Sequence, residues 1–247
     1  MLRQKALRII VTILLVLGFW MGNFSAVLSV ALADGFVYEE RSFHSPDGIG
    51  KFYFDREIAH VMGHEGADWL ERPRRSGEEQ PQKVITALDL KPTDVVADIG
   101  AGTGYFSFRI APRVPQGKVF AVDVQPEMIE ILNELKAKKH LSNVEPLLSS
   151  VTDPQLPKNS VDLALMVDAY HEFEYPQEMM RAIVQALKPG GRVALVEYRG
   201  ENPLILIKAL HKMTQVQVKK EMAAIGLTYR ETRNGLPQQH LMIFEKP

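Results

Sequence analysis

The chain has 247 residues, of which 46% are hydrophobic and 24% are charged, which is the composition of a globular protein with one large core. Its formal net charge of −1 provides no basic surplus, so we expect no nucleic-acid partner. The absence of cysteine excludes disulfides, thiolate metal ligands and cysteine nucleophiles, but it leaves the compartment open.

The N-terminal segment has the features of a targeting or anchoring sequence. Three basic residues precede an apolar run over residues 9–21, and no acidic residue occurs before Asp34. With the small residues of Ala31-Leu32-Ala33, this pattern is typical of a signal peptide, but the stretch is also long enough for a membrane anchor. We therefore expect residues 1–33 to form a hydrophobic helix that is cleaved or retained. The protein would be exported or membrane-anchored, facing the periplasm or a lumen by the charge rule.

Residues 34–81 are polar and aromatic and are expected to form a collar or lid. A helix is predicted near Asp55–Met62. His60 and His64 lie four residues apart, a spacing that places two imidazoles on one face of a helix, where they can bind a metal. Gly63 between them argues against a firm helix and no third ligand is evident, so we expect no metal site.

From residue 82 onward, short apolar runs alternate with segments of helical period, which is typical of stacked βαβ units and a parallel sheet. The predicted strands are Val95–Ile99, Lys118–Val122, Val144–Leu148, Val161–Val167 and Arg192–Glu197. The predicted helices are Gln125–Lys139, Gln177–Leu187 and Val216–Ile225. Two further runs, Leu227–Glu231 and Leu241–Phe244, are predicted to form an antiparallel hairpin at the sheet edge. Residues 82–247 are thus expected to be one doubly wound α/β domain.

A glycine-rich turn follows the first of these strands. In DIGAGTGYF, Gly100, Gly102 and Gly104 permit a tight turn and let a ligand lie against bare backbone, while a helix beginning near Tyr105 offers free N–H groups. The sequence therefore predicts a small anionic or polar ligand here. The spacing is GxGxG, whereas the dinucleotide fingerprint GxGxxG has its third glycine where this chain has Tyr105. A nicotinamide or flavin site is accordingly disfavoured.

An acidic residue, Asp123, ends the second strand. It lies about 20 residues after the glycines, where a carboxylate can accept hydrogen bonds from both hydroxyls of a ribose. The turn and the carboxylate together indicate a nucleoside-type ligand.

Four successive motifs resemble those of class I S-adenosylmethionine-dependent methyltransferases. They are ADIGAGTGYF, VFAVDVQPEM, VTDPQLPKNSVDLALMVDAYHEF and ALKPGGRVALVEY, and the resemblance extends over residues 82–198. It implies a Rossmann-like fold with a mostly parallel seven-stranded sheet, and S-adenosylmethionine as cofactor.

The resemblance also implies which residues border the cofactor. From its methionine end to its adenine, these are Asp98, Gly100, Gly102, Gly104, Asp123, Thr152 and Asp153. Asp168, the first residue after the fourth strand, is counted with them because ligands of open α/β sheets lie beyond the carboxyl ends of the strands.

The same strand end delivers the candidate catalytic residues Tyr170 and His171. Methyl transfer is an in-line displacement in which the enzyme aligns a nucleophile and, where needed, removes its proton. His171 can serve as that base. Tyr170 can orient the substrate or pack against the sulfonium, since a cation over an aromatic face is stabilised by about 0.5 to 2 kcal/mol. Alternatively, the pair only caps the next helix and lines the pocket.

We therefore expect a methyltransferase acting on a small-molecule or lipid-like substrate, with membrane association through its N-terminal segment. The alternatives are a non-catalytic domain that holds the cofactor and an NAD-dependent oxidoreductase. One conflict accompanies the expected location, because S-adenosylmethionine is made inside the cytoplasm while the charge rule places the domain outside it.

Overall fold

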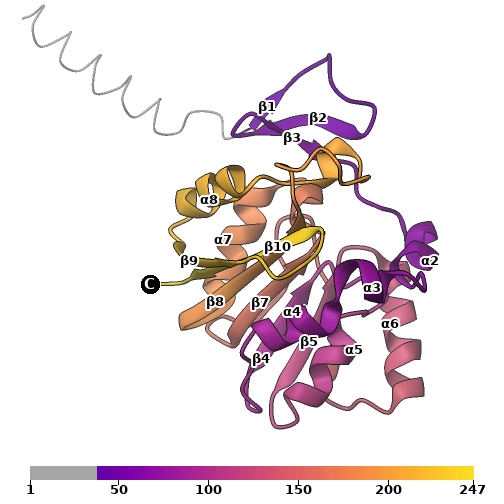
Figure 1. The fold of residues 1–247 in the computed structure, drawn as a ribbon. Helices are drawn as coiled ribbons and strands as arrows, with labels where there is room; N and C mark the ends of the chain where they lie inside the picture. The colour runs from indigo at the N-terminus through magenta and orange to yellow at the C-terminus, as the bar shows by residue number, and fades with distance from the viewer. Residues whose placement is uncertain (1–37) are drawn as a thin grey trace, which may run out of the picture. The chain divides into compact units, whose positions relative to one another are not determined.

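The computed structural model describes residues 38–247, and Figure 1 shows their strands and helices in chain order. The predicted signal peptide or anchor, residues 1–33, lies outside this range. Within residues 38–247, no helix combines the length and the apolar composition required to cross a membrane. Residues 40–247 form one compact unit.

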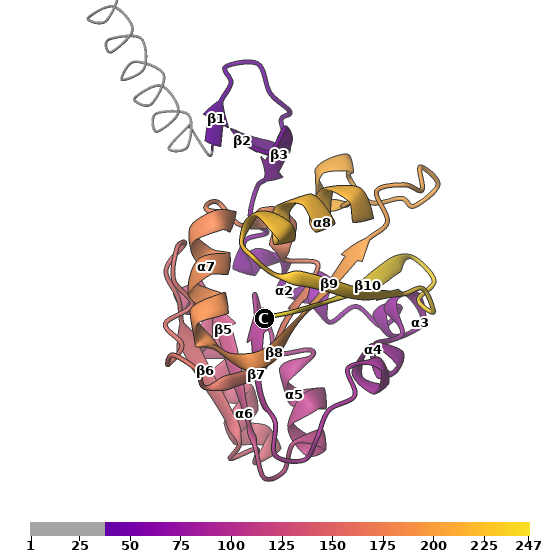
Figure 2. The same cartoon turned by 90° about the vertical axis from the view of Figure 1, so that its left-hand side faces the viewer.

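The main sheet has seven strands in the order β6-β5-β4-β7-β8-β10-β9. Their bounds are β4 Val95–Ile99, β5 Lys118–Asp123, β6 Val144–Leu148, β7 Val161–Val167, β8 Leu187–Tyr198, β9 Thr228–Arg233 and β10 Gln239–Glu245. Strands β4 to β8 pair in parallel, and β10 pairs antiparallel with both β8 and β9. The predicted Rossmann-like fold is therefore confirmed, including the C-terminal hairpin at the edge (Figure 1, Figure 2). Strand β8 starts earlier than predicted, at Leu187 rather than Arg192.

Helices cover both faces of this sheet. Those of one face are α4 Pro81–Ala87, α5 Ser107–Ile110 and α6 Pro126–Lys139, and those of the other are α7 Pro176–Ala186 and α8 Gln215–Ala224. Three of them begin with proline, whose fixed φ and missing N–H suit the first helical position. The hydroxyl of Thr214 caps α8 by accepting a hydrogen bond from the Gln217 amide.

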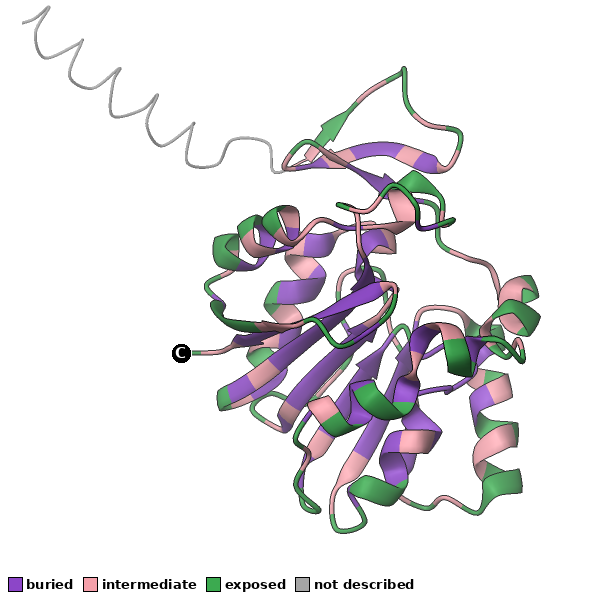
Figure 3. Cartoon of the chain, viewed as in Figure 1, coloured by how far each residue is buried: buried purple, intermediate pink, exposed green. Residues whose placement is uncertain are grey.

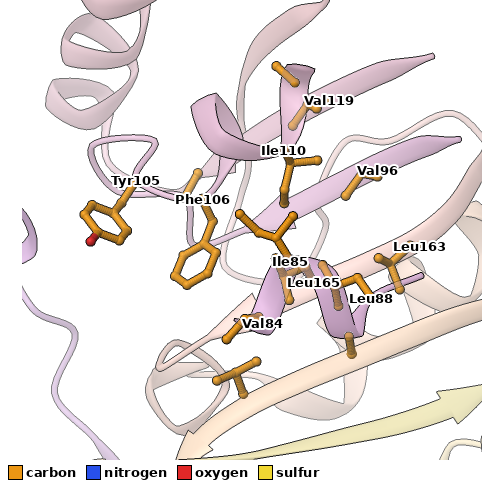
Figure 4. Close-up of a cluster of buried hydrophobic side chains, with 14 of the residues drawn as sticks. Val84, Ile85, Leu88, Val96, Tyr105, Phe106, Ile110, Val119, Leu163 and Leu165 are labelled. Atoms are coloured by element: carbon orange, nitrogen blue, oxygen red, sulfur yellow. The ribbon is translucent and has the colours of Figure 1, made fainter. Parts of the chain in front are cut away.

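The core lies between these layers, where β4, β5, β7, β8 and β10 are buried along most of their length (Figure 3). On the α4 face, Val84, Ile85 and Leu88 pack with Val96 of β4 and Leu163 of β7, and all five are at most 2% exposed (Figure 4). Truncating one such side chain to alanine costs about 2 to 5 kcal/mol. This packing holds the ends of the parallel strands in fixed positions, and the candidate site is built on those ends.

The region predicted as a collar contains a second sheet, and the predicted helix over Asp55–Met62 is wrong. Strands β1 (Tyr38–Glu40), β2 (Gly48–Tyr53) and β3 (Arg56–Ala59) are followed by η1 (His64–Gly66), α2 (Ala67–Leu70) and α3 (Arg75–Glu79). Strands β2 and β3 form a hairpin in which Tyr53 faces Arg56 across the turn. Phe54 and Asp55 both have positive φ, 49° and 69°, as a two-residue hairpin turn requires. This turn contains no glycine, which is why its positive φ values were not predicted.

Candidate active site

A cavity of about 710 Å³ lies at the carboxyl ends of the parallel strands. Residues that follow β4, β5, β6 and β7 form one wall, and the other walls come from residues 47–79 and 198–211. Ligands of open α/β sheets bind at this edge, because the strand ends and the helix N-termini converge there.

The glycine turn after β4 forms the floor of one end of the cavity. Gly100 and Gly102 have φ of 74° and 54°, in the left-handed region that favours glycine. A Cβ added to Gly100 would lie 2.7 Å from the Cβ of Ala169, and one added to Gly102 would lie 2.6 Å from Cδ1 of Leu70. The turn thus has no room for side chains, and a ligand can rest directly on the backbone.

Asp123, at the end of β5, fixes this turn and faces the same cavity. Its Oδ2 accepts a hydrogen bond of 2.8 Å from the Gly102 amide, and its Oδ1 accepts one of 3.0 Å from the Gln125 amide. Burial raises the pKa of the Asp123 carboxyl, which is only 5% exposed. A carboxylate has about four acceptor positions, so two remain for the paired hydroxyls of a ribose.

Two further carboxyls and a guanidinium lie beyond the glycines. Asp98 accepts a hydrogen bond of 2.6 Å from the Ser107 hydroxyl, and burial raises its pKa to about 6. Oδ2 of Asp168 accepts a 2.6 Å hydrogen bond from Nε2 of the Gln239 side chain, while its buried Oδ1 has no partner. Burial also raises the pKa of Asp168 well above its usual range. Arg75 also lines the cavity, but its guanidinium donates to Oε2 of Glu79 and to the carbonyl of Leu70, both at 2.8 Å. The carboxyls of Asp98 and Asp168 suit an ammonium group, such as that of an amino acid.

At the end of β6, the cavity is lined by Ser149, Ser150 and Val151. Thr152 and Asp153, predicted to border an adenine, are not among the lining residues. Instead they complete the loop: the Ser150 amide donates to the Asp153 carbonyl at 3.0 Å, and the Asp153 amide donates to the Ser150 hydroxyl at 3.0 Å. The side chain of Asp153 is exposed and accepts from the Gln155 amide.

The other end of the cavity is formed by a cluster around His171, which is 2% exposed. Its Nδ1 lies 2.7 Å from Oε2 of Glu197, a β8 residue with no exposed surface. Its Nε2 lies 3.1 Å from Nδ1 of His211, in η4 (Ala209–His211). Glu172 completes the cluster, with Oε1 3.3 Å from Nδ1 of His211. These four side chains come from three elements far apart in the sequence.

Burial controls the charge of the His171–Glu197 pair. It lowers the pKa of His171 to about 3 and raises the pKa of Glu197 to about 8. Both shifts favour the uncharged form of each group at neutral pH, so the pair as a whole carries no net charge. A histidine oriented by a carboxylate in this manner can act as a base or as a ligand.

Tyr170, predicted beside His171 as an orienting or sulfonium-packing residue, does not line the cavity. Its ring is 1% exposed, and its hydroxyl donates a 2.7 Å hydrogen bond to Oε2 of Glu221 in α8. Arg56 of β3 donates to both oxygens of the same carboxylate, at 2.8 and 3.0 Å, and also to the carbonyl of His171. These hydrogen bonds therefore attach η3 (Tyr170–Glu172) to α8 and to β3.

The predicted site residues that line the cavity are Asp98, Gly100, Gly102, Asp123, Asp168 and His171. Gly104 does not; it packs inward, where an added Cβ would meet Phe108 and Leu132. The sequence did not predict Glu197 and His211, which lie 26 and 40 residues after His171 and have no motif spacing to it. Glu172 directly follows His171 in the sequence, so its place beside His171 could have been predicted. Arg199, which directly follows β8, donates to Oδ1 of Asn234 and to the Leu236 carbonyl.

This geometry defines an α/β domain that binds a nucleoside carrying an amino-acid group. Comparisons with known proteins agree. A family model described as a methyltransferase domain matches residues 90–242, which is more than half of the chain. The chain belongs to this family, the class I S-adenosylmethionine-dependent methyltransferases.

Curated relatives match the chain over about half of its length. An uncharacterized methyltransferase-like protein of Schizosaccharomyces pombe is 38% identical over 42% of this chain and 38% of its own length. An arsenite methyltransferase of Halobacterium salinarum is 33% identical over 43% of this chain and 27% of its own length. A demethylmenaquinone methyltransferase of Chlamydia muridarum is 28% identical over 49% of this chain and 52% of its own length. The chain therefore spans about half of these relatives or less.

A solved structure, a SAM-dependent methyltransferase from Aquifex aeolicus, has the same fold. It superposes with a TM-score of 0.72 at 24% identity and covers 76% of this chain and 100% of its own. The residues present fit S-adenosylmethionine, the cofactor of the family. The unpartnered Oδ1 of Asp168 and the bare backbone at Gly100 and Gly102 match its amino-acid end and its centre, and Asp123 matches its ribose.

Proposed function

We propose that this protein transfers a methyl group from S-adenosylmethionine to a hydroxyl of a small molecule with an apolar body. The observation that carries the proposal is the continuity of the cavity, whose lining includes both the nucleoside-binding residues and the His171 cluster. Its volume of about 710 Å³ lies in the upper part of the range of about 300 to 1,000 Å³ for ligand pockets, which favours a cofactor and an acceptor together.

The apolar character of the acceptor is inferred from the rim of the cavity. Val61, Trp69 and Leu206 line it, although they are 46%, 50% and 96% exposed. Exposed apolar side chains that surround a cavity favour a ligand with an apolar body. Two relatives are named for small acceptors, arsenite and demethylmenaquinone. The rim is also compatible with a lipid-like acceptor presented at a membrane, as the expected N-terminal anchor suggests.

His171 is proposed to activate the acceptor hydroxyl. S-adenosylmethionine supplies an electrophilic methyl group, so the chain has to align the nucleophile and dispose of its proton. When Nδ1 of His171 donates to Glu197, the lone pair of Nε2 lies on the side of His211 in the cavity. That lone pair can take the proton directly or hold a cation that promotes its loss. Asp98 and Asp168 hold the ammonium of the methionine end, and Asp123 holds the ribose.

Calorimetric titration of the full chain with S-adenosylmethionine and with NAD tests the cofactor assignment. We expect binding of the former with one site per chain and no comparable heat with NAD. Clear binding of NAD alone would contradict the proposal and support the oxidoreductase alternative.

Transfer is then measured with methyl-labelled cofactor and a series of phenols that differ in the length of an attached alkyl chain. His171→Ala is expected to abolish transfer while it leaves cofactor binding within about threefold of the wild type. Cofactor binding without transfer to any member of the series would favour the non-catalytic alternative.

A further inference from the structure

The structure brings together three potential metal ligands that no sequence motif connects. They are Nε2 of His171, Oε1 of Glu172 and Nδ1 of His211, which all lie within 4.8 Å of one another. All three residues line the cavity. They come from η3 and from η4, which are in contact in the fold although about 40 positions separate the two histidines.

The spacing of the three atoms suits a first-row metal ion. The nitrogens are 3.1 Å apart, and Oε1 lies 3.3 Å from His211 Nδ1 and 3.7 Å from His171 Nε2. Atoms at these separations lie on a circle with a radius of about 2.0 Å. A cation slightly above their plane is thus about 2.1 Å from each, the usual length of bonds from zinc and related ions to histidine and carboxylate.

The surroundings hold the ligands in the orientation that a metal requires. Glu197 lies 2.7 Å from Nδ1 of His171, so Nδ1 can carry the proton and Nε2 is left with its lone pair. The second oxygen of Glu172 accepts a hydrogen bond of 3.2 Å from the Met62 amide, which directs Oε1 toward the histidines. Histidines that bind metals almost always have such a carboxylate or carbonyl partner on the other ring nitrogen.

We propose that His171, Glu172 and His211 bind a divalent transition-metal ion whose remaining coordination positions face the cavity and receive the acceptor oxygen. Two imidazoles and one carboxylate favour zinc, iron, cobalt or manganese over the harder magnesium and calcium, which prefer oxygen ligands. Three ligands on one side of the ion leave positions open for water or substrate. The assignment of the acceptor oxygen rests on the proposed function, whereas the ion site itself does not.

The ion would replace direct proton transfer to His171 in the activation of the acceptor. A hydroxyl bound to the cation loses its proton to solvent, because the positive charge stabilises the oxyanion. The oxyanion then forms the bond to the methyl carbon as the carbon–sulfur bond breaks, and that bonding pair remains on the sulfur. His171 and His211 stay neutral ligands throughout.

The test uses the full chain after removal of metals with a chelator. Titration with Co²⁺ is followed by visible absorption, and with Zn²⁺ by calorimetry. We expect one ion per chain. His211→Ala should weaken binding at least about tenfold and change the cobalt spectrum. His64→Ala serves as the matched control, because it removes an imidazole that lies outside the cluster and should leave both readouts unchanged.

A second pair of measurements separates this inference from the proposed function. The His211 side chain is partly exposed, so His211→Ala should retain the circular dichroism and the S-adenosylmethionine affinity of the wild type. Retention of both would show that the variant has lost the metal and not its fold. Failure of the wild type to bind either ion at millimolar concentration would overturn the inference, as would unchanged binding by His211→Ala. Cofactor binding without metal binding would leave the proposed function standing, and the reverse result would leave only the ion site.

Discussion

The buried ion pair between Arg56 and Glu221 allows a sharp test of how the hairpin β2–β3 is attached to the domain. Glu221 has no exposed surface and receives two hydrogen bonds from Arg56, one from Tyr170 and one from Gln217. The Arg56 side chain is 10% exposed and also donates to the carbonyl of His171. Arg56→Met leaves the apolar stem but removes the charge. Glu221 is then a buried carboxylate without a cation.

Breaking a buried pair from one side costs about 3 to 5 kcal/mol, because the remaining charge stays uncompensated. This is a substantial part of a total stability of about 5 to 15 kcal/mol. The double variant Arg56→Met with Glu221→Met removes both charges. It is expected to lie within about 2 kcal/mol of the wild type, since apolar replacement of a whole pair is often nearly neutral. The coupling energy between the two sites is therefore several kcal/mol.

Urea unfolding followed by circular dichroism measures all four members of this cycle. Arg230→Met is the matched control, because Arg230 makes an equally short pair with Glu245, at 2.7 Å, but is 52% exposed. Exposed pairs contribute about 0 to 1 kcal/mol. If Arg56→Met costs no more than Arg230→Met, burial of the Glu221 charge is not what makes the pair important, and the reasoning fails.

Three further outcomes are expected. Gly102→Ala places a Cβ 2.6 Å from Leu70 at a φ of 54°, so it should weaken S-adenosylmethionine binding at least about tenfold in calorimetry, whereas Gly77→Ala, with open space around it, should not. Burial raises the pKa of Asp98 from 3.8 to about 6, so the stability that its protonated form contributes is complete below about pH 4 and is lost as the pH rises through 6. Asp98→Asn does not titrate, and urea unfolding should show its stability rising relative to the wild type by about 2 kcal/mol between pH 4 and pH 7. Leu206→Ser should raise KM for long-chain acceptors with little change in kcat, because the exposed side chain contacts only the apolar body.

Each of these outcomes has a clear contradiction. Equal cofactor affinity of the two glycine variants would show that the turn does not form the cofactor floor. A constant difference between Asp98→Asn and the wild type across this pH range would show that Asp98 titrates as an exposed acid. An unchanged KM in Leu206→Ser for every chain length would remove the argument that the rim selects an apolar acceptor.

Much of the main sheet followed from local patterns. Strands β4, β6 and β7 begin and end at the predicted residues, and the major helices differ from their predicted bounds by about one residue. Short apolar runs bounded by turns specify strands that are buried on both faces, and this signal depends only on neighbouring residues. The cofactor end was accessible for the same reason, because Gly100, Gly102 and Asp123 lie at fixed positions after consecutive strands.

The tertiary structure alone decided the rest. The hairpin turn at Phe54–Asp55 has positive φ values but contains no glycine that would indicate them. A short helix was therefore predicted where a strand forms. His211 lies in a segment with no recognisable motif, and only packing of η4 against η3 brings it to His171. Sequence periodicity reports which residues are buried along one element, but it does not report which side chains from separate elements meet. Local sequence patterns thus predicted the main sheet and much of the glycine-turn end of the cavity, whereas the β2–β3 hairpin and the His171 cluster depend on contacts between distant segments.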